Sequence, residues 1–88
     1  MTRFPITVGR VVRSKAGRDS GRLFLVVRIL DEEHLMIADG DLRKLEKPKK
    51  KKLRHLAATA SECECPDIDR LRNSDVRKLL QNANDKEG

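Results

Sequence analysis

Cationic side chains gather around two glycines in the first quarter of the chain. Gly17 and Gly21 bracket Arg18, Asp19 and Ser20, and glycine tolerates positive φ and lets another backbone approach closely. An arginine fork donates two hydrogen bonds at once to phosphate oxygens. The pattern predicts an anion-binding loop, against the alternative of solvated charge in which Asp19 partly neutralises Arg18. The candidate residues of this group are Arg10, Arg13, Lys15, Gly17, Arg18, Gly21 and Arg22.

A second basic group lies between residues 43 and 55 and is the most positive part of the chain. Lysine runs of this kind are often solvated and disordered. This run stands directly beside a predicted strand, which we expect to hold at least Lys52 and Arg54 in fixed positions. The run therefore favours binding to a polyanion. The candidate residues are Arg43, Lys44, Lys47, Lys49, Lys50, Lys51, Lys52, Arg54 and His55.

Patterns typical of catalysis or metal binding are not recognisable in the sequence. Asp39 and Asp41 flank a glycine, where aspartate already has a structural role in a turn. His55, Cys63 and Cys65 give at most three zinc ligands, whereas a closed structural site has four. We therefore expect a protein that is not an enzyme, holds no metal or cofactor, and takes no small-molecule substrate.

Charge is distributed unevenly along the 88 residues, whose net charge is +6. Residues 1–55 hold 15 Lys and Arg against 7 Asp and Glu, whereas residues 56–88 hold 5 against 7. The basic surface belongs to the first half, where it favours polyanions such as nucleic acid. The longest apolar stretch, residues 23–30, is far shorter than the roughly 20 residues of a membrane span. The first residues lack a signal-peptide core and the two cysteines are poorly spaced for a disulfide, so we expect a cytoplasmic protein.

Hydrophobic patterning predicts a small β domain over residues 1–58. Residues 9–14 and 22–30 read as strands, and the nearly continuous apolar character of the second implies burial on both faces or at a bend of a barrel. A polar turn leads into a third strand at 35–38, which an Asp-Gly pair ends. Residues 4–8 give a weak strand or an extended arm.

Later elements follow from Pro48 and from a change in composition. Pro48 predicts a loop over 46–51, followed by a closing strand at 52–58 with Leu53 and His55 on one side. Residues 59–67 read as a linker. Residues 68–88 read as a helical extension, with a helix at 75–83 capped by Ser74 and a frayed end from residue 82. We expect an apolar stripe on this helix to dock on the β domain.

The strand, glycine loop and second strand together resemble a KOW motif. The likeness is carried by residues 9–12, 16–21 and 23–29 and extends over 38–45, within a region of roughly 5–57. Specifically, the chain is similar to small bacterial KOW-domain RNA-binding proteins, which are themselves similar to KOW-type proteins of the large ribosomal subunit. The resemblance implies a small SH3-like barrel of KOW type that binds RNA or ribosomal components. The long lysine run and the C-terminal extension depart from a minimal KOW unit, so the family implies no contacts there. Together with the helix predicted above, the expected fold is mostly β, a small SH3-like barrel with a short C-terminal helix.

Aromatic residues bear on the kind of RNA. Only Phe4 and Phe24 are present, so the stacking platforms of single-strand binders are missing, and recognition should depend on phosphates and shape. We expect folded RNA, ribosomal RNA above all, with ribosomal proteins as further partners, no membrane contact, and a monomer when free. Two alternatives stay open, a protein-interaction module and a peripheral binder of anionic membranes that uses the lysine run.

Overall fold

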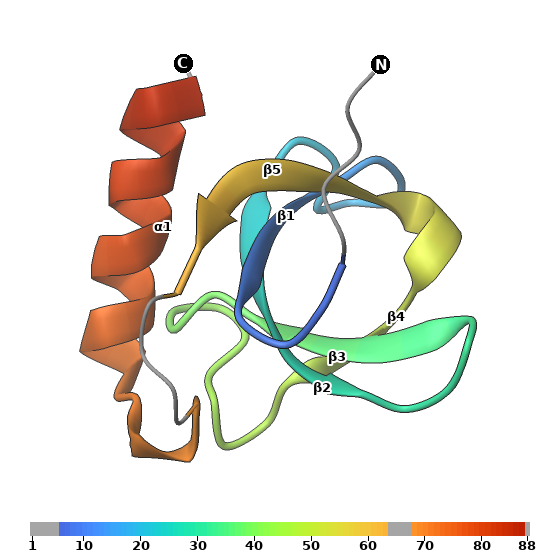
Figure 1. Ribbon diagram of the computed structural model, residues 1–88, viewed down its shortest axis with the longest axis horizontal. Helices are drawn as coiled ribbons and strands as arrows, with labels where there is room; N and C mark the ends of the chain where they lie inside the picture. Colours follow the sequence, from blue (N-terminus) through green and yellow to red (C-terminus); the bar gives the residue numbers. More distant parts are fainter. Residues whose placement is uncertain (1–5, 64–67, 88) are drawn as a thin grey trace.

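The structure is a computed structural model that describes residues 6–63 and 68–87, in which one five-stranded antiparallel sheet precedes one C-terminal helix (Figure 1). The expectation of a mostly β chain with a C-terminal helix is confirmed. The strands occur in the order β4-β3-β2-β1-β5. They are β1 (Arg10–Ser14), β2 (Leu23–Ile29), β3 (His34–Ala38), β4 (Lys49–Lys52) and β5 (Leu56–Glu62). Two 3-10 turns, η1 (Leu53–His55) and η2 (Ile68–Arg70), and the helix α1 (Asn73–Glu87) complete the fold.

The sheet is open and strongly curled, and its two edge strands are linked by one short turn. The edge strands β4 and β5 are consecutive in the chain and are joined by η1 alone, and Figure 1 shows the strands wrapping around a common interior. Irregular pairing between Arg10 and Val12 on β1, and between Val26 and Arg28 on β2, supports this curvature. A bulge at such a point bends the strand and increases its twist.

Both faces of the central strands are buried, as the apolar run of β2 predicted. Val11 and Val12 follow one another in β1 and point to opposite faces, yet neither is exposed to solvent. Each side chain of this size contributes about 1.5–3 kcal/mol through burial. The cluster inside the curl consists of Val12, Phe24, Val26, Leu35, Ile37 and Leu56. The cluster on the opposite face consists of Val11, Leu25, Val76, Leu80 and Ala83.

The helix covers the outer face of the central strands. Val76, Leu80 and Ala83 lie at helical spacing on its buried side, which confirms the predicted docking stripe. Because Ala83 still packs on the sheet, α1 continues through Glu87, past the predicted end.

The predicted cap at Ser74 is wrong, because the helix begins at Asn73. The Asp75 carboxylate accepts the Arg72 N–H at 3.0 Å, and the Arg72 carbonyl accepts the Val76 N–H. Arg72 therefore occupies the capping position. The side chain of Asn73 is used instead to hold the β3–β4 loop: its Oδ1 accepts the Leu45 N–H at 2.8 Å.

The segment around the lysine run differs from its prediction. Residues 49–52 form β4, so the predicted loop over 46–51 is wrong in its second half. Residues 53–55 form η1 instead of the start of a closing strand, because the chain must turn there from one sheet edge to the other. The alternation of side chains predicted across 53–56 is therefore wrong.

The remaining boundaries also shift. β5 continues to Glu62, four residues into the predicted linker, because Thr59 is buried and its hydroxyl donates to the Val11 carbonyl at 2.8 Å. Residues 64–67 of that linker lie outside the described residues. Residues 6–8 form no strand, and residues 4 and 5 of the predicted segment lie outside the described residues.

We expect Gly40→Ala to destabilise the fold more than Gly21→Ala. Both glycines have positive φ, +77° and +89°, so both substitutions introduce a strain of about 1–2 kcal/mol. A Cβ at Gly40 would also overlap the carbonyl oxygen of Asn73, whereas Gly21 has no neighbouring atom within 4 Å. Urea unfolding should show that Gly40→Ala lowers the free energy of unfolding by about 1–3 kcal/mol more than Gly21→Ala does. Equal losses for the two variants would contradict this close approach of the loop to α1.

Candidate nucleic-acid interface

The loop between β1 and β2 turns one carboxylate inward. Gly17 and Gly21 have φ of +84° and +89°, as the sequence predicted for a loop at this position. Between them the chain bends back, with the Ser20 N–H donating to the Gly17 carbonyl and the Gly21 N–H to the Ser14 carbonyl. Asp19 consequently points into the structure, and its side chain is only 13% exposed.

Asp19 joins two strands that are not neighbours in the sheet. Its Oδ1 accepts hydrogen bonds from the Ser14 hydroxyl of β1 at 2.8 Å and from Lys51 Nζ of β4 at 3.0 Å. Its Oδ2 accepts from Lys49 Nζ at 3.1 Å. Lys51 also donates to the Ala16 carbonyl at 3.1 Å. We call this group of Asp19, Ser14, Lys49 and Lys51 the Asp19 tie.

The acidity of Asp19 reflects these contacts. Burial by itself raises the pKa of a carboxyl group, but the hydrogen bonds from Ser14, Lys51 and Lys49 outweigh it and hold the pKa of Asp19 well below its ordinary value. The carboxylate is therefore charged at neutral pH and neutralises two lysines, not Arg18 as the sequence suggested.

The lysine run is divided by strand geometry. Lys49 and Lys51 lie opposite Ile37 and Leu35 of β3, and directly opposed residues share one face of a sheet. This face is the interior of the curl, where Lys51 is 9% exposed. Lys50 and Lys52 lie on the other face and are exposed. Two of the four lysines therefore make contacts that support the fold and two face solvent, a division that composition alone does not reveal.

Cations from the two predicted groups meet at one hollow. It has a volume of about 300 Å³ and lies beside the Asp19 tie. Arg18 and Arg22 come from the β1–β2 loop, and Arg43 and Lys49 come from the other basic group. Arg18 and Arg43 are exposed and make no side-chain hydrogen bond or ion pair within the described ranges. The remaining walls are Asp19, Phe24, Asp39 and Leu42.

Asp39 fixes the side of the hollow that Leu42 and Arg43 form. Its Oδ1 accepts the N–H groups of Asp41 at 2.9 Å and Arg43 at 2.8 Å, and Oδ2 lies 3.3 Å from Arg22 Nη2. The Asp39 N–H in turn donates to the Arg43 carbonyl. Asp39 therefore has the turn role that sequence reasoning gave it, and its carboxylate is already occupied.

A second cationic cluster lies at η1. The Lys15 N–H donates to the His55 carbonyl at 2.8 Å, which brings the end of β1 beside Arg54 and Lys52. Burial and then the charges of Arg54, Lys51, Lys52 and Lys15 lower the pKa of His55. His55 thus reports a positive potential, which is the property an anion-binding surface requires.

Other predicted site residues have different surroundings. Arg10, predicted as a residue of the anion-binding group, is buried, with its guanidinium 3.3 Å from the Thr59 carbonyl and 3.3 Å from Glu62. Arg13 is half-buried and donates to the Gly21 carbonyl at 2.7 Å, so it supports the loop. Lys44 and Lys47 are exposed in the β3–β4 loop and do not line the hollow.

Sequence reasoning missed the apolar part of the hollow. Leu42 is the most exposed large hydrophobic residue described, at 68%, and Phe24 contributes from the core. The sequence did offer a signal for the exposure of Leu42. This residue directly follows Asp39, Gly40 and Asp41, which form a predicted turn, and an apolar side chain at a turn is often left exposed.

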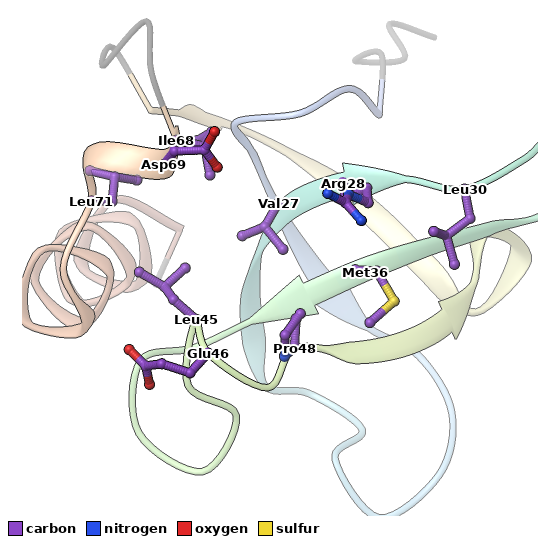
Figure 2. A pocket seen from close by; sticks show the side chains of 10 residues that line it. All are labelled: Val27, Arg28, Leu30, Met36, Leu45, Glu46, Pro48, Ile68, Asp69 and Leu71. Carbon is purple, nitrogen blue, oxygen red and sulfur yellow. The ribbon is translucent and has the colours of Figure 1, made fainter.

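A larger pocket of about 500 Å³ lies elsewhere, between β2, β3 and the segment before α1 (Figure 2). Most of the residues that line it are apolar, with Met36 and Pro48 on one side and Ile68 and Leu71 on the other. Among its charged residues, Glu46 and Asp69 outnumber Arg28. This lining is poorly suited to phosphate.

Comparison with protein-family models gave no match, and no curated protein matched the sequence. Within the described ranges, no helix combines the length and apolar character needed to cross a bilayer.

We expect Asp19→Asn to destabilise the fold by about 1–3 kcal/mol at pH 7, because Lys51 loses its charged partner while the shape is kept. The folded pKa of Asp19 lies below the unfolded value of about 3.9, so the tie stabilises fully above that value and less as pH falls through it. Urea unfolding should show that the difference in free energy of unfolding between wild type and variant decreases as the pH is lowered from about 5 to about 2.

Asp31→Asn is the matched control. Hydrogen bonds from the Glu33 N–H and the His34 side chain also lower the pKa of Asp31, but its side chain is 58% exposed in a hairpin turn. The control should lose much less stability than Asp19→Asn. Equal stability of Asp19→Asn and wild type at pH 7 would contradict the structural role of the tie.

Proposed function

We propose that this protein is a non-catalytic RNA-binding protein of the KOW type that docks on folded RNA, ribosomal RNA above all, in translation. The observation that carries the proposal is the hollow, where Arg18 and Arg22 meet Arg43 and Lys49. Arg18 and Arg22 come from the β1–β2 loop, whereas Arg43 comes from the β3–β4 loop and Lys49 from the start of β4, far from them in the chain. Arg18 and Arg43 have no internal partner in the described part of the chain, so they are free to bind phosphate.

The SH3-like barrel belongs to the same proposal. A barrel requires the edges of a sheet to approach one another, and the edge strands β4 and β5 are joined by η1 alone. Of the motif residues 9–12, Gly9 precedes β1 and residues 10–12 form its start, and residues 16–21 form the loop that holds Asp19. These features support the KOW resemblance, and with it a cytoplasmic protein that is monomeric when free.

The mechanism is electrostatic docking. RNA phosphates would lie along the hollow and the cluster of Lys15, Lys52, Arg54 and His55. Lys51 and Arg10 are buried in their internal contacts and stay out of the interface. Lys49 and Arg22 are also ion-paired, but their side chains are 33% and 44% exposed and can still contact a phosphate. Neutralising about five phosphates gives a slope of log K against log salt of roughly −3.5 to −4.5.

A second candidate function, docking on a protein, is favoured by the aliphatic pocket of Figure 2. Ile29 and Leu30 are 46% and 44% exposed, and Leu30 lines this pocket. A protein partner would cover this apolar surface without using the lysine run, as the protein-interaction alternative requires.

Removing Arg18 and Arg43 together should weaken binding to a structured RNA hairpin and reduce the salt slope by roughly 1.5, because each phosphate contact contributes about 0.7–0.9. Fluorescence anisotropy over a salt series measures this with the double variant Arg18→Gln, Arg43→Gln. The control removes the same charge elsewhere, at Arg28 and Lys78, which do not line the hollow. If the control variant loses as much slope, binding follows net charge and the hollow is not the interface.

RNA affinity should also rise as pH is lowered from about 7.5 to about 5.5. Burial and then the nearby cations lower the pKa of His55 in the free protein, and a bound phosphate raises it, so binding takes up a proton. Affinity measured across this pH range should become flat in His55→Gln. His34→Gln, which alters a histidine paired with Asp31, should keep the dependence. A pH profile unchanged in His55→Gln would exclude η1 from the interface.

A further inference from the structure

The hollow combines cations with an apolar surface, a combination that phosphate binding alone does not need. Phosphate oxygens are satisfied by Arg18, Arg22, Arg43 and Lys49, and they gain nothing from Leu42. A volume of about 300 Å³ is at the lower end of small-ligand pockets and suits a single nucleotide. The apolar surface therefore points to a part of RNA other than its backbone.

Leu42 is held in place although it is exposed. The N–H groups on both sides of it, those of Asp41 and Arg43, donate to Asp39 Oδ1 at 2.9 Å and 2.8 Å. Asp39 is 5% exposed and is anchored in turn by Arg22. The loop therefore presents Leu42 in a fixed position, so little conformational entropy is lost when a ligand contacts it.

The arginines of the hollow offer planar surfaces beside this leucine. Arg18 and Arg43 come from opposite loops and have no side-chain partner in the described ranges. A guanidinium plane stacks on a splayed nucleobase as aromatic rings do. A base is apolar on its faces, whereas bases inside a duplex present only their edges. An unpaired base can therefore use both Leu42 and the guanidinium planes.

We propose that the hollow receives one unpaired nucleotide of a folded RNA, with its base against Leu42 and the guanidinium planes of Arg18 and Arg43 and its phosphate on Lys49 and Arg22. The inference rests on the proposed RNA-binding function and specifies its ligand. The protein then recognises a bulged or looped nucleotide within a folded RNA, and not a continuous duplex.

The test compares two RNA hairpins that differ at one position. One carries a single-nucleotide bulge of 2-aminopurine, and the other pairs that base within the stem. The full-length wild type should bind the bulged hairpin roughly 5- to 100-fold more tightly, the range expected for one stacked base. Emission of 2-aminopurine should rise on binding, because the base leaves the helical stack.

Leu42→Ser is the informative variant, because this exposed side chain is not part of the core. It should lower affinity for the bulged hairpin to near that for the paired one and leave the paired hairpin unaffected. Leu30→Ser is the matched control, since Leu30 is an exposed leucine that lines the other pocket. Urea midpoints of both variants establish that they are folded.

The outcomes separate this inference from the proposed function. If wild type binds both hairpins equally and the emission stays constant, the nucleotide pocket is overturned while RNA binding stands. If Leu42→Ser weakens both hairpins alike, the selective contact with an unpaired base is also overturned. If neither hairpin binds at low salt, the RNA-binding function itself fails.

Discussion

The inward-pointing carboxylate of Asp19 is the contact that links the glycine loop, the curled sheet and its basic surface. It accepts hydrogen bonds from Ser14 of β1 and from Lys49 and Lys51 of β4, two strands separated in the sheet by β2 and β3. Removing one partner from such a site leaves an uncompensated charge in poorly solvated surroundings. The tie thus holds the glycine loop over the lysine strand, and two of its members, Asp19 and Lys49, line the hollow beside Arg18 and Arg43.

The strands that could be predicted are those whose signal is local. β1, β2 and β3 follow from runs of β-branched and aliphatic residues bounded by glycine and aspartate, and both faces of β2 were expected to be buried. β4 was missed because four lysines carry no apolar signal, and Pro48 suggested a loop. The lysines are acceptable in a strand because alternate ones reach Asp19, about 30 residues earlier in the chain. Sequence spacing does not reveal such a pairing.

The site could be predicted as two basic groups but not as a geometry. Arg18, Arg22, Arg43 and Lys49 were all candidates, and the fold brings them to one hollow. Reasoning from charge alone could not remove Arg10, whose burial depends on its contact with Thr59 of β5. It also could not select Leu42, since the importance of an exposed leucine depends on what lies around it. The sequence pattern identifies the types of residue in the site, and tertiary contacts decide which of these residues remain free to contact a ligand.

This division of the cations bears on how folding and binding are related. Lys50 and Lys52 share a short strand with two paired lysines, and like charges at such spacing repel one another. The Asp19 tie offsets the repulsion only for Lys49 and Lys51. A polyanion bound along β4 would offset the rest, and a ligand that binds only the folded chain stabilises it. Under the proposed function, the same charges that weaken β4 in the free protein are therefore the ones through which RNA stabilises the strand.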